Sequence, residues 1–247
     1  MVTALKPTQS VAVKNNKMNV MKLSDIIDIL TALSKVRKLF WSEDDFKFEF
    51  ATMIKVKFGD KVDIRLEKRY ERERERKMQS SYTDIVVKMG KRSFPIELKY
   101  KTVADRYPDY DGEVIQLKTH GAVDLGCYAY LKDVERLEYL SQTDETYERG
   151  FAIILTNEPL YYKNTGKESV YDDFKIYEGR EVHPGILDWD RSGYNPEKLP
   201  SWLKSHPPFS LMRSYKMEWR DYGSKMQHIE NIDEYVQFKY QIAVIDK

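Results

Sequence analysis

Apolar residues in the first quarter of the chain recur at helical spacing in two runs. One run follows Ser24, and the other opens at Ser42 and closes at Gly59. Apolar positions three and four apart lie on one face of an α-helix, serine is a favoured N-cap, and glycine commonly ends a helix. The pattern therefore predicts two amphipathic helices, with Ser24 and Ser42 as their N-caps.

Segments of strand length follow Gly59. Four apolar or alternating runs are bounded by turn or polar residues, at 62–70, 82–89, 92–101 and 150–157. Runs of this length and composition are typical of β-strands. Between the third run and the fourth, residues 115–140 return to a helical period. We therefore expect an α/β protein whose core elements follow the order αβββαβ.

The two ends of the chain carry weaker patterns. Residues 1–21 have no clear period and are expected to form a flexible N-terminal arm, whereas residues 22–160 hold the core elements. Residues 161–247 are rich in loops, but alternation at 209–222 and 234–246 predicts a β-hairpin. We expect a single domain, with this last segment packed on the core as a C-terminal β elaboration.

Two acidic residues interrupt neighbouring strands, and the turn between the strands sets them side by side. Gly90-Lys91 suits a two-residue hairpin turn. Such a turn places Asp84 opposite Glu97 on the same side of the sheet, with Lys99 on that side two positions further along. Directly opposed residues have Cβ atoms about 4.5–5.5 Å apart, and like charges at those positions destabilise a sheet.

A divalent metal ion between the two acids would remove this conflict. Carboxylate and carbonyl oxygens are the ligands that Mg²⁺ and Mn²⁺ prefer. We therefore expect Asp84 and Glu97 to bind Mg²⁺ or Mn²⁺, with the main-chain carbonyl of Leu98 as a further ligand. Lys99 would orient or help to deprotonate an attacking water and offset charge on a phosphate. The competing interpretation is a surface lane of salt bridges, because an acid in an amphipathic strand usually faces solvent.

A further carboxylate is expected from the second helix, where Glu43 and Glu49 are the candidates. Counting about 100° per residue from Phe46, Glu43 lies nearer the apolar face than Glu49 does. We therefore favour Glu43 as the catalytic helix acid. An acid in the first helical turn also complements the helix dipole, which gives Glu43 a purely structural explanation as well.

The later helical segment supplies candidate contacts to nucleic acid. Gln116 and Tyr128 belong to a polar edge of residues spaced by four, and Lys101 lies in a basic segment at 99–106. Such groups can contact phosphates or stack on bases, although a polar helix edge is more commonly just a solvated flank. The net charge of +1 argues against a protein that coats duplex DNA, so we expect any such contact to be local.

The composition indicates an ordinary globular protein. Of its 247 residues, 41% are hydrophobic and 33% are charged, a balance that is typical of folded domains. The sequence lacks the ~20-residue apolar run of a membrane span and the apolar centre of a secretory signal. Its single cysteine, Cys127, has no partner for an internal disulfide. We expect a cytoplasmic protein with no membrane partner.

Taken together, these residues resemble the PD-(D/E)xK nuclease superfamily, which has the restriction-endonuclease-like fold. Glu43 corresponds to the helix acid, Asp84 to the second-strand aspartate, and Glu97-Leu98-Lys99 to the (D/E)xK motif, while Thr83 stands where the motif has proline. The similarity covers about residues 42–157. The stretches LKDVERLE and GFAIILTNEPLYY are similar to those of an uncharacterised prokaryotic group in this superfamily.

The resemblance implies a central mixed sheet flanked by helices and Mg²⁺-dependent hydrolysis of phosphodiester bonds, in DNA for most members, with roles in restriction, repair or defence. Asp84 and Glu97 would be the metal ligands, Lys99 would position or activate water, and Glu43 would support a metal or its water. The alternative function is a non-catalytic or partner-dependent nucleic-acid-binding module with the same fold. Cleavage of DNA or RNA, from an end or internally, and a homodimer or a partner protein all stay open.

Overall fold

A six-stranded mixed sheet forms the centre of the molecule. The computed structural model describes residues 20–74, 77–109, 112–230 and 233–247. In spatial order the sheet contains β1 (Asp63–Arg74), β2 (Lys77–Met89), β3 (Arg92–Lys101), β6 (Arg149–Thr156), β14 (Lys239–Asp246) and β11 (Trp219–Asp221). β3 and β6 run parallel, and every other neighbouring pair is antiparallel. The expected α/β class is confirmed.

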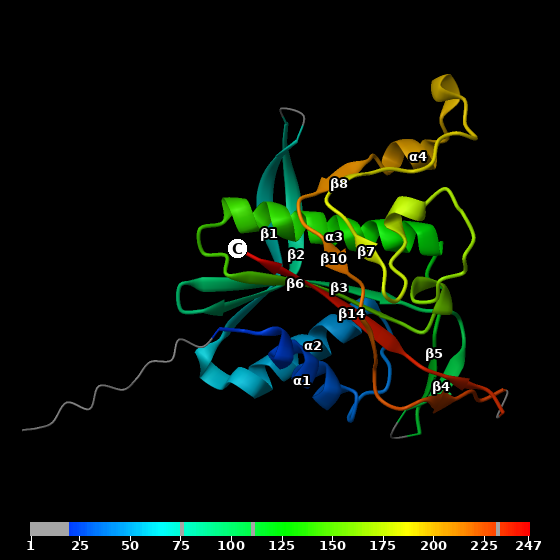
Figure 1. Ribbon diagram of the computed structural model, residues 1–247. Coiled ribbons are helices and arrows are strands. Elements are labelled where there is room, and N and C mark those ends of the chain that lie inside the picture. The colour runs from blue at the N-terminus through cyan, green and yellow to red at the C-terminus, as the bar shows by residue number, and fades with distance from the viewer. Residues whose placement is uncertain (1–19, 75–76, 110–111, 231–232) are drawn as a thin grey trace, which may run out of the picture.

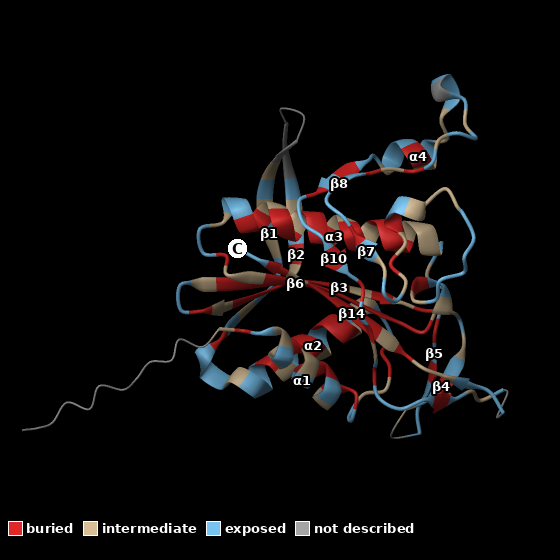
Figure 2. Ribbon diagram, in the orientation of Figure 1, coloured by how far each residue is buried: buried red, intermediate tan, exposed pale blue. Residues whose placement is uncertain are grey.

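Helices cover both faces of this sheet (Figure 1). α1 (Leu23–Leu33) and α2 (Glu43–Phe58) lie on one face, and α3 (Val123–Thr143) lies on the other. Ile85 and Ile96 pack with α1 and α2, whereas Ala152 and Ile154 pack with α3, so a separate hydrophobic core lies on each side (Figure 2). Because successive strand residues face opposite sides, Glu97, the neighbour of Ile96, faces α3, where it lies beside Arg136.

The sequence signals at the ends of the first two helices differ in how well they predict the boundaries. The Ser42 hydroxyl caps α2 by accepting a backbone N–H at 3.1 Å, and Gly59 ends that helix with a φ of 60°. α1 opens earlier than expected, because its N-cap is Lys22 and not Ser24. The Lys22 backbone N–H donates to the Asp25 carboxylate at 2.8 Å, which closes the first turn around this earlier start.

The helix expected from residue 115 begins only at Val123. Residues Val114–Gln116 form β5, which pairs with β4 (Arg106–Pro108). Ile115 is buried and Gln116 is exposed, which is the alternation of a strand. Gly121 has a φ of 58°, a left-handed value that does not continue a right-handed helix. Over so short a stretch, apolar spacing alone did not separate the two periods.

The hairpin of β2 and β3 has the expected register. Gly90 adopts a φ of 62°, Met89 pairs with Arg92, and Ile85 pairs with Ile96. Beyond Ile85, β2 continues as the partner of β1, and this long β1–β2 hairpin projects past the sheet beside α3 (Figure 1). The next opposed residues in the register are Asp84 and Glu97, so the two acids lie where β2 and β3 part.

The C-terminal segment completes the sheet instead of only packing on it. β14 pairs with β6 over its whole length, and β11 pairs with β14 through Trp219 and Gln241. The hairpin expected from 209–222 and 234–246 is therefore present in part. Its first strand is divided into β9 (Phe209–Leu211), β10 (Tyr215–Lys216) and β11, and the other short elements are β7 (Glu181–Val182), β8 (Gly185–Leu187), β12 (Met226–Gln227), β13 (Tyr235–Val236) and α4 (Ser201–Ser205).

Two further expectations concern the N-terminal arm and the membrane. Residues 1–19 of the expected arm lie outside the described residues, and Met21 is fully buried in the core beside α1, so the core begins before residue 22. Every helix in the described part of the chain is too short or too polar to cross a bilayer.

Candidate active site

The candidate site lies where β2 no longer pairs with β3. There, two carboxylates accept hydrogen bonds from the unpaired edge of β3. Asp84 Oδ2 accepts the backbone N–H of Leu98 at 2.8 Å, and Glu43 Oε2 accepts the backbone N–H of Tyr100 at 2.8 Å. Backbone N–H groups in the interior need such partners. β3 therefore fixes the positions of both acids, and the Ser42 cap holds Glu43 at the first position of α2.

Glu97 is the most deeply buried acid of the site, with 1% of its surface exposed. Its Oε1 atom lies 3.2 Å from Arg136 Nη1, in a geometry that does not make a hydrogen bond. Burial raises the pKa of Glu97 well above its ordinary value; the negative charge of Asp133 adds to the rise, and the positive charge of Arg136 opposes it. Glu97 therefore holds a proton more readily than an exposed glutamate does.

Lys99 lies between acids contributed by two different helices. Its Nζ is 2.8 Å from Asp133 Oδ2 on α3 and 3.9 Å from Glu43 Oε1 on α2, and it donates to the Leu98 carbonyl at 3.2 Å. Burial disfavours the charged amine, but the negative charges of Asp133 and Glu43 outweigh this effect and raise the pKa of Lys99. The side chain is therefore a stable ammonium ion, which can orient water or contact a phosphate but cannot accept a proton.

Three site residues were not identified from the sequence: Lys47, Asp133 and Arg136. Lys47 on α2 lies 3.1 Å from Asp84 Oδ1 and also contacts Glu67. Asp133 and Arg136, one turn apart on α3, form an ion pair. Asp133 lies within the apolar face of α3, three residues after Tyr130 and four before Leu137, so an acid at core spacing was the signal that could have revealed it. We find no comparable signal for Lys47.

The donor atoms of the site are of the kind that Mg²⁺ and Mn²⁺ bind. The carboxylates of Asp84 and Glu97 and the carbonyl of Leu98 are hard oxygen ligands, and Glu97 Oε1 is buried without a hydrogen bond. Within the described residues, however, no three or more His, Cys, Asp or Glu side chains gather closely enough to hold an ion. The donors thus fit a divalent cation in kind, and in this structure the Lys47 ammonium lies beside Asp84 Oδ1.

The structure separates the two candidate helix acids. Glu43 lies beside Lys99 and β3, as described above, whereas Glu49 forms an ion pair of 2.9 Å with Arg37. Arg37 also contacts Asp45 on the same helix at 2.7 Å. Glu49 is therefore held by a structural contact away from Asp84 and Lys99.

The three expected nucleic-acid contacts have different positions. Tyr128 is 6% exposed, donates to the Pro207 carbonyl at 2.8 Å and stacks on Trp189, so it packs an aromatic core and is not on a polar helix edge. Gln116 belongs to β5 and is exposed, but it is not on α3. Lys101 is partly exposed at the end of β3.

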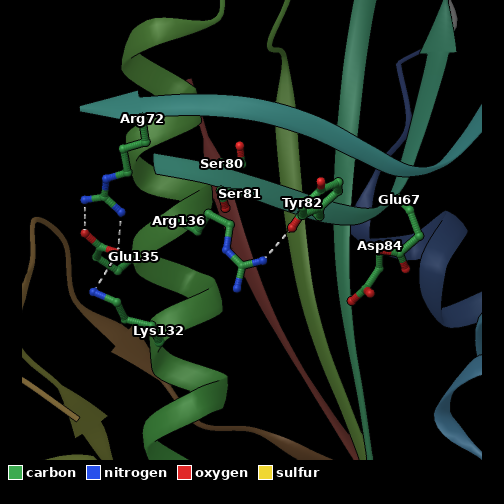
Figure 3. Close-up of a pocket in the computed structure, with 9 residues that line it drawn as sticks. All are labelled: Glu67, Arg72, Ser80, Ser81, Tyr82, Asp84, Lys132, Glu135 and Arg136. Atoms are coloured by element: carbon green, nitrogen blue, oxygen red, sulfur yellow. Dashed lines mark hydrogen bonds and ion pairs between the residues drawn. The ribbon is translucent and has the colours of Figure 1, made fainter. Parts of the chain in front are cut away.

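A cleft of about 440 Å³ opens beside Asp84, between the β1–β2 hairpin and α3 (Figure 3). Three cationic side chains and three acidic ones line it: Arg72, Lys132, Arg136, Glu67, Asp84 and Glu135. Arg72 and Lys132 contact Glu135 at 2.8 and 3.2 Å, and Arg136 donates to the Tyr82 carbonyl at 2.6 Å. Asp84 lies on the side of the cleft that faces α2 (Figure 3). The formal charges of the lining balance, and its cations are paired with acids, so the cleft itself has no net positive charge.

Comparison of the chain with protein-family models, with curated proteins and with solved structures finds no match. The resemblance to PD-(D/E)xK nucleases therefore depends on the residues and the geometry described above.

Proposed function

We propose that the protein is a divalent-metal-dependent nuclease that hydrolyses phosphodiester bonds, with DNA as its substrate, on a restriction-endonuclease-like core. The order α2, β1, β2, β3, α3, β6, with β3 and β6 parallel, supports the core. The observation that carries the proposal is the convergence of Asp84, Glu43 and Lys99 on the edge of β3 that β2 leaves free. An endonuclease and an exonuclease are equally compatible with it.

In this proposal Asp84, Glu97 and the Leu98 carbonyl would hold Mg²⁺ or Mn²⁺, which when bound would supply a Lewis acid for the phosphate and lower the pKa of a water. The residues of the chain itself position the reactants. Lys99, kept protonated by Asp133 and Glu43, donates to a water or to a non-bridging phosphate oxygen. Glu43, held by the Tyr100 N–H, keeps Lys99 beside the strand edge.

The test is a cleavage panel in which the protein is mixed with plasmid, single-stranded DNA and RNA in Mg²⁺, Mn²⁺ or EDTA. We expect metal-dependent cleavage that falls at least ~100-fold in Asp84→Asn. Glu43→Gln should weaken cleavage, whereas Glu49→Gln, the matched acid on the same helix, should leave it unchanged. Intact substrates under all conditions, or cleavage indifferent to Asp84→Asn, would overturn the proposal.

A second candidate function is a nucleic-acid-binding module without catalysis. It is favoured by one observation, namely that the site is already neutralised by protein cations: Lys47 contacts Asp84, Lys99 contacts Asp133, and Arg136 contacts Glu97. This function predicts a salt-dependent shift in DNA mobility with no cleavage. It also predicts no thermal stabilisation by Mg²⁺ or Mn²⁺, whereas a functional metal site gains stability through binding.

A further inference from the structure

A second cavity lies at the C-terminal end of β3, beyond Lys99 and Glu43. Its volume is about 530 Å³, within the ~300–1,000 Å³ that is usual for small-molecule sites. The residues that line it come from the start of α2, the end of β3 and the segment before α3: Trp41, Ser42, Thr102, Gln116, Leu117, Lys118 and His120. None of these side chains has a part in the hydrolytic step proposed above.

Trp41 is the largest side chain of the cavity, and half of its surface is exposed. Its backbone is nevertheless fixed, because its N–H donates to Asp45 Oδ2 at 2.9 Å. An indole that is open to solvent offers a flat apolar surface for stacking. The other tryptophans that the structure describes as buried, Trp189 and Trp219, are 2% and 8% exposed, so they offer no such surface.

The part of the cavity wall formed by Thr102, Lys118 and His120 is already ordered by hydrogen bonds. Thr102 Oγ1 donates to the Lys118 carbonyl at 2.6 Å, and the His120 N–H donates to the Thr102 carbonyl at 2.8 Å. The Thr102 N–H also donates to His120 Nδ1 at 3.2 Å. These bonds hold the segment before α3 against the extension of β3, so a ligand would bind without having to order this wall.

The cavity adjoins the candidate active site, and two lysines supply positive charge there: Lys118 lines the cavity, and the charge of Lys101 acts on His120. Ser42 directly precedes Glu43, and Thr102 lies three residues after Lys99, which is about 10 Å along a strand. Burial and the positive charge of Lys101 lower the pKa of His120, while Glu43 partly offsets this. The charges of Lys101 and Lys118 and that of Glu43 in the active site therefore all act on His120.

We propose that this cavity binds a nucleobase of single-stranded nucleic acid, next to the phosphodiester bond at the candidate active site. The base stacks on Trp41, and the exposed amide of Gln116 contacts its polar edge. Lys101 and Lys118 contact the flanking phosphates. The part of this proposal in which the neighbouring site cleaves the bound strand rests on the nuclease function. Binding at Trp41 is measured separately from cleavage. It gives a preference for single strands, because a base within a duplex is not free to enter the cavity.

The experiment measures binding in EDTA, where the metal-dependent reaction cannot proceed. The probes are fluorescein-labelled oligo-dT, oligo-U and an abasic oligonucleotide of the same length, followed by anisotropy, and unlabelled oligo-dT, followed by tryptophan fluorescence. The variants are Trp41→Ala, Trp41→Phe and Phe48→Ala. Phe48 is a matched control because it is an aromatic side chain on the adjoining helix α2 and is 62% exposed, but it does not line the cavity.

We expect oligo-dT to quench the fluorescence of the unmodified protein and to lose this effect in Trp41→Phe while still binding. Trp41→Ala should bind oligo-dT about 5–150-fold more weakly, the loss expected for one stacked base, and should no longer distinguish it from the abasic probe. Phe48→Ala should bind as the unmodified protein does. A preference for oligo-dT or oligo-U would identify the sugar that the site accepts.

Equal affinity of Trp41→Ala and the unmodified protein for oligo-dT, equal affinity for the abasic probe, or no binding at all would each overturn the base site. None of these results tests Asp84-dependent cleavage. If that cleavage is observed, the protein is a nuclease without the base site. Conversely, quenching that depends on Trp41, together with intact substrates in every metal, would leave the base site standing and remove the nuclease.

Discussion

Glu97 and Glu138 are both carboxylic acids with almost no exposed surface, 1% and 0% respectively, and both belong to the side of the sheet that α3 covers. Their partners differ. Glu138 accepts from the backbone N–H groups of Met212 and Arg213 at 2.9 and 3.1 Å and from the Tyr215 hydroxyl at 2.8 Å. Glu97 instead lies among charged side chains, with Oε1 outside any hydrogen bond.

The difference shows that Glu138 stabilises the fold, whereas burying Glu97 costs stability. Burial raises the pKa of both groups. For Glu138, the bonds from Met212, Tyr215 and Arg213 counteract the rise and anchor the segment before β10. For Glu97, the nearby acids Asp133 and Asp84 add to the rise, and the cations Arg136 and Lys99 oppose it. A buried acid that has an unbonded oxygen and a raised pKa beside like charges is a feature that proteins keep at functional sites.

The largest expected effect separates the two acids by activity. Glu97→Gln should reduce metal-dependent cleavage at least ~100-fold, because a neutral amide is a poor ligand for Mg²⁺. Its stability should equal or exceed that of the unmodified protein. Cleavage rates with plasmid substrate and thermal unfolding curves measure the two quantities. Retained cleavage in Glu97→Gln would place Glu97 with Glu138 among structural acids.

Stability should show the opposite order. Glu138→Ala leaves the Met212 and Arg213 N–H groups and the Tyr215 hydroxyl without their acceptor. We expect it to lower the free energy of unfolding by about 1.5–3 kcal/mol, as for lost hydrogen bonds to a charged group. Urea unfolding measures this loss, and cleavage at 25 °C should stay within about twofold of the unmodified protein. A marked drop in activity without a drop in stability would contradict the structural role.

Asp133 links the functional acid to Lys99 and gives a smaller effect. Asp133→Asn removes the charge that raises the pKa of Lys99, so the ammonium should lose its proton at lower pH. Because Lys99 stays protonated at neutral pH in both proteins, we expect the change to appear as an alkaline limb of the pH–rate profile that lies at lower pH in Asp133→Asn. Asp124→Asn, at the start of the same helix, is the control and should leave the profile in place. If the alkaline limb does not move in Asp133→Asn, Asp133 is not the group that positions Lys99 and keeps it protonated.

The smallest effect is the pH dependence of stability. The folded-state pKa of Glu97 is raised, so the neutral acid favours the folded state below its unfolded pKa, and this advantage is lost as the pH rises through the folded pKa. Glutamine does not titrate. The stability of Glu97→Gln relative to the unmodified protein, followed through the melting temperatures of the two, should therefore grow with pH. The gain in free energy of unfolding should be on the order of 1 kcal/mol. A difference that shrinks with rising pH would mean that Glu97 is stabilised in its charged form.

The sequence best predicted those features of the site that depend on residues close together in the chain. Gly90 fixed the register of β2 and β3, which was enough to set Asp84 and Glu97 at adjacent positions, and Ser42 located Glu43. The sequence did not predict Asp133 and Arg136 because their part depends on how α3 packs across β3. The parallel pairing that supports this arrangement, such as Glu97 with Ala152, joins strands separated by a whole helix, and no local signal records it.

The long-range pairing of β6 also has a consequence for folding. β6 lies between β3 and β14, and its residues Arg149 and Thr156 pair with Asp246 and Lys239. A hairpin such as β2–β3 closes quickly, whereas contacts between residues so distant in sequence form slowly, because the loop must first be brought together. We therefore expect β6 to be held on one side only until β14 pairs with it, so that the sheet that carries Glu97 and Lys99 is completed late in folding.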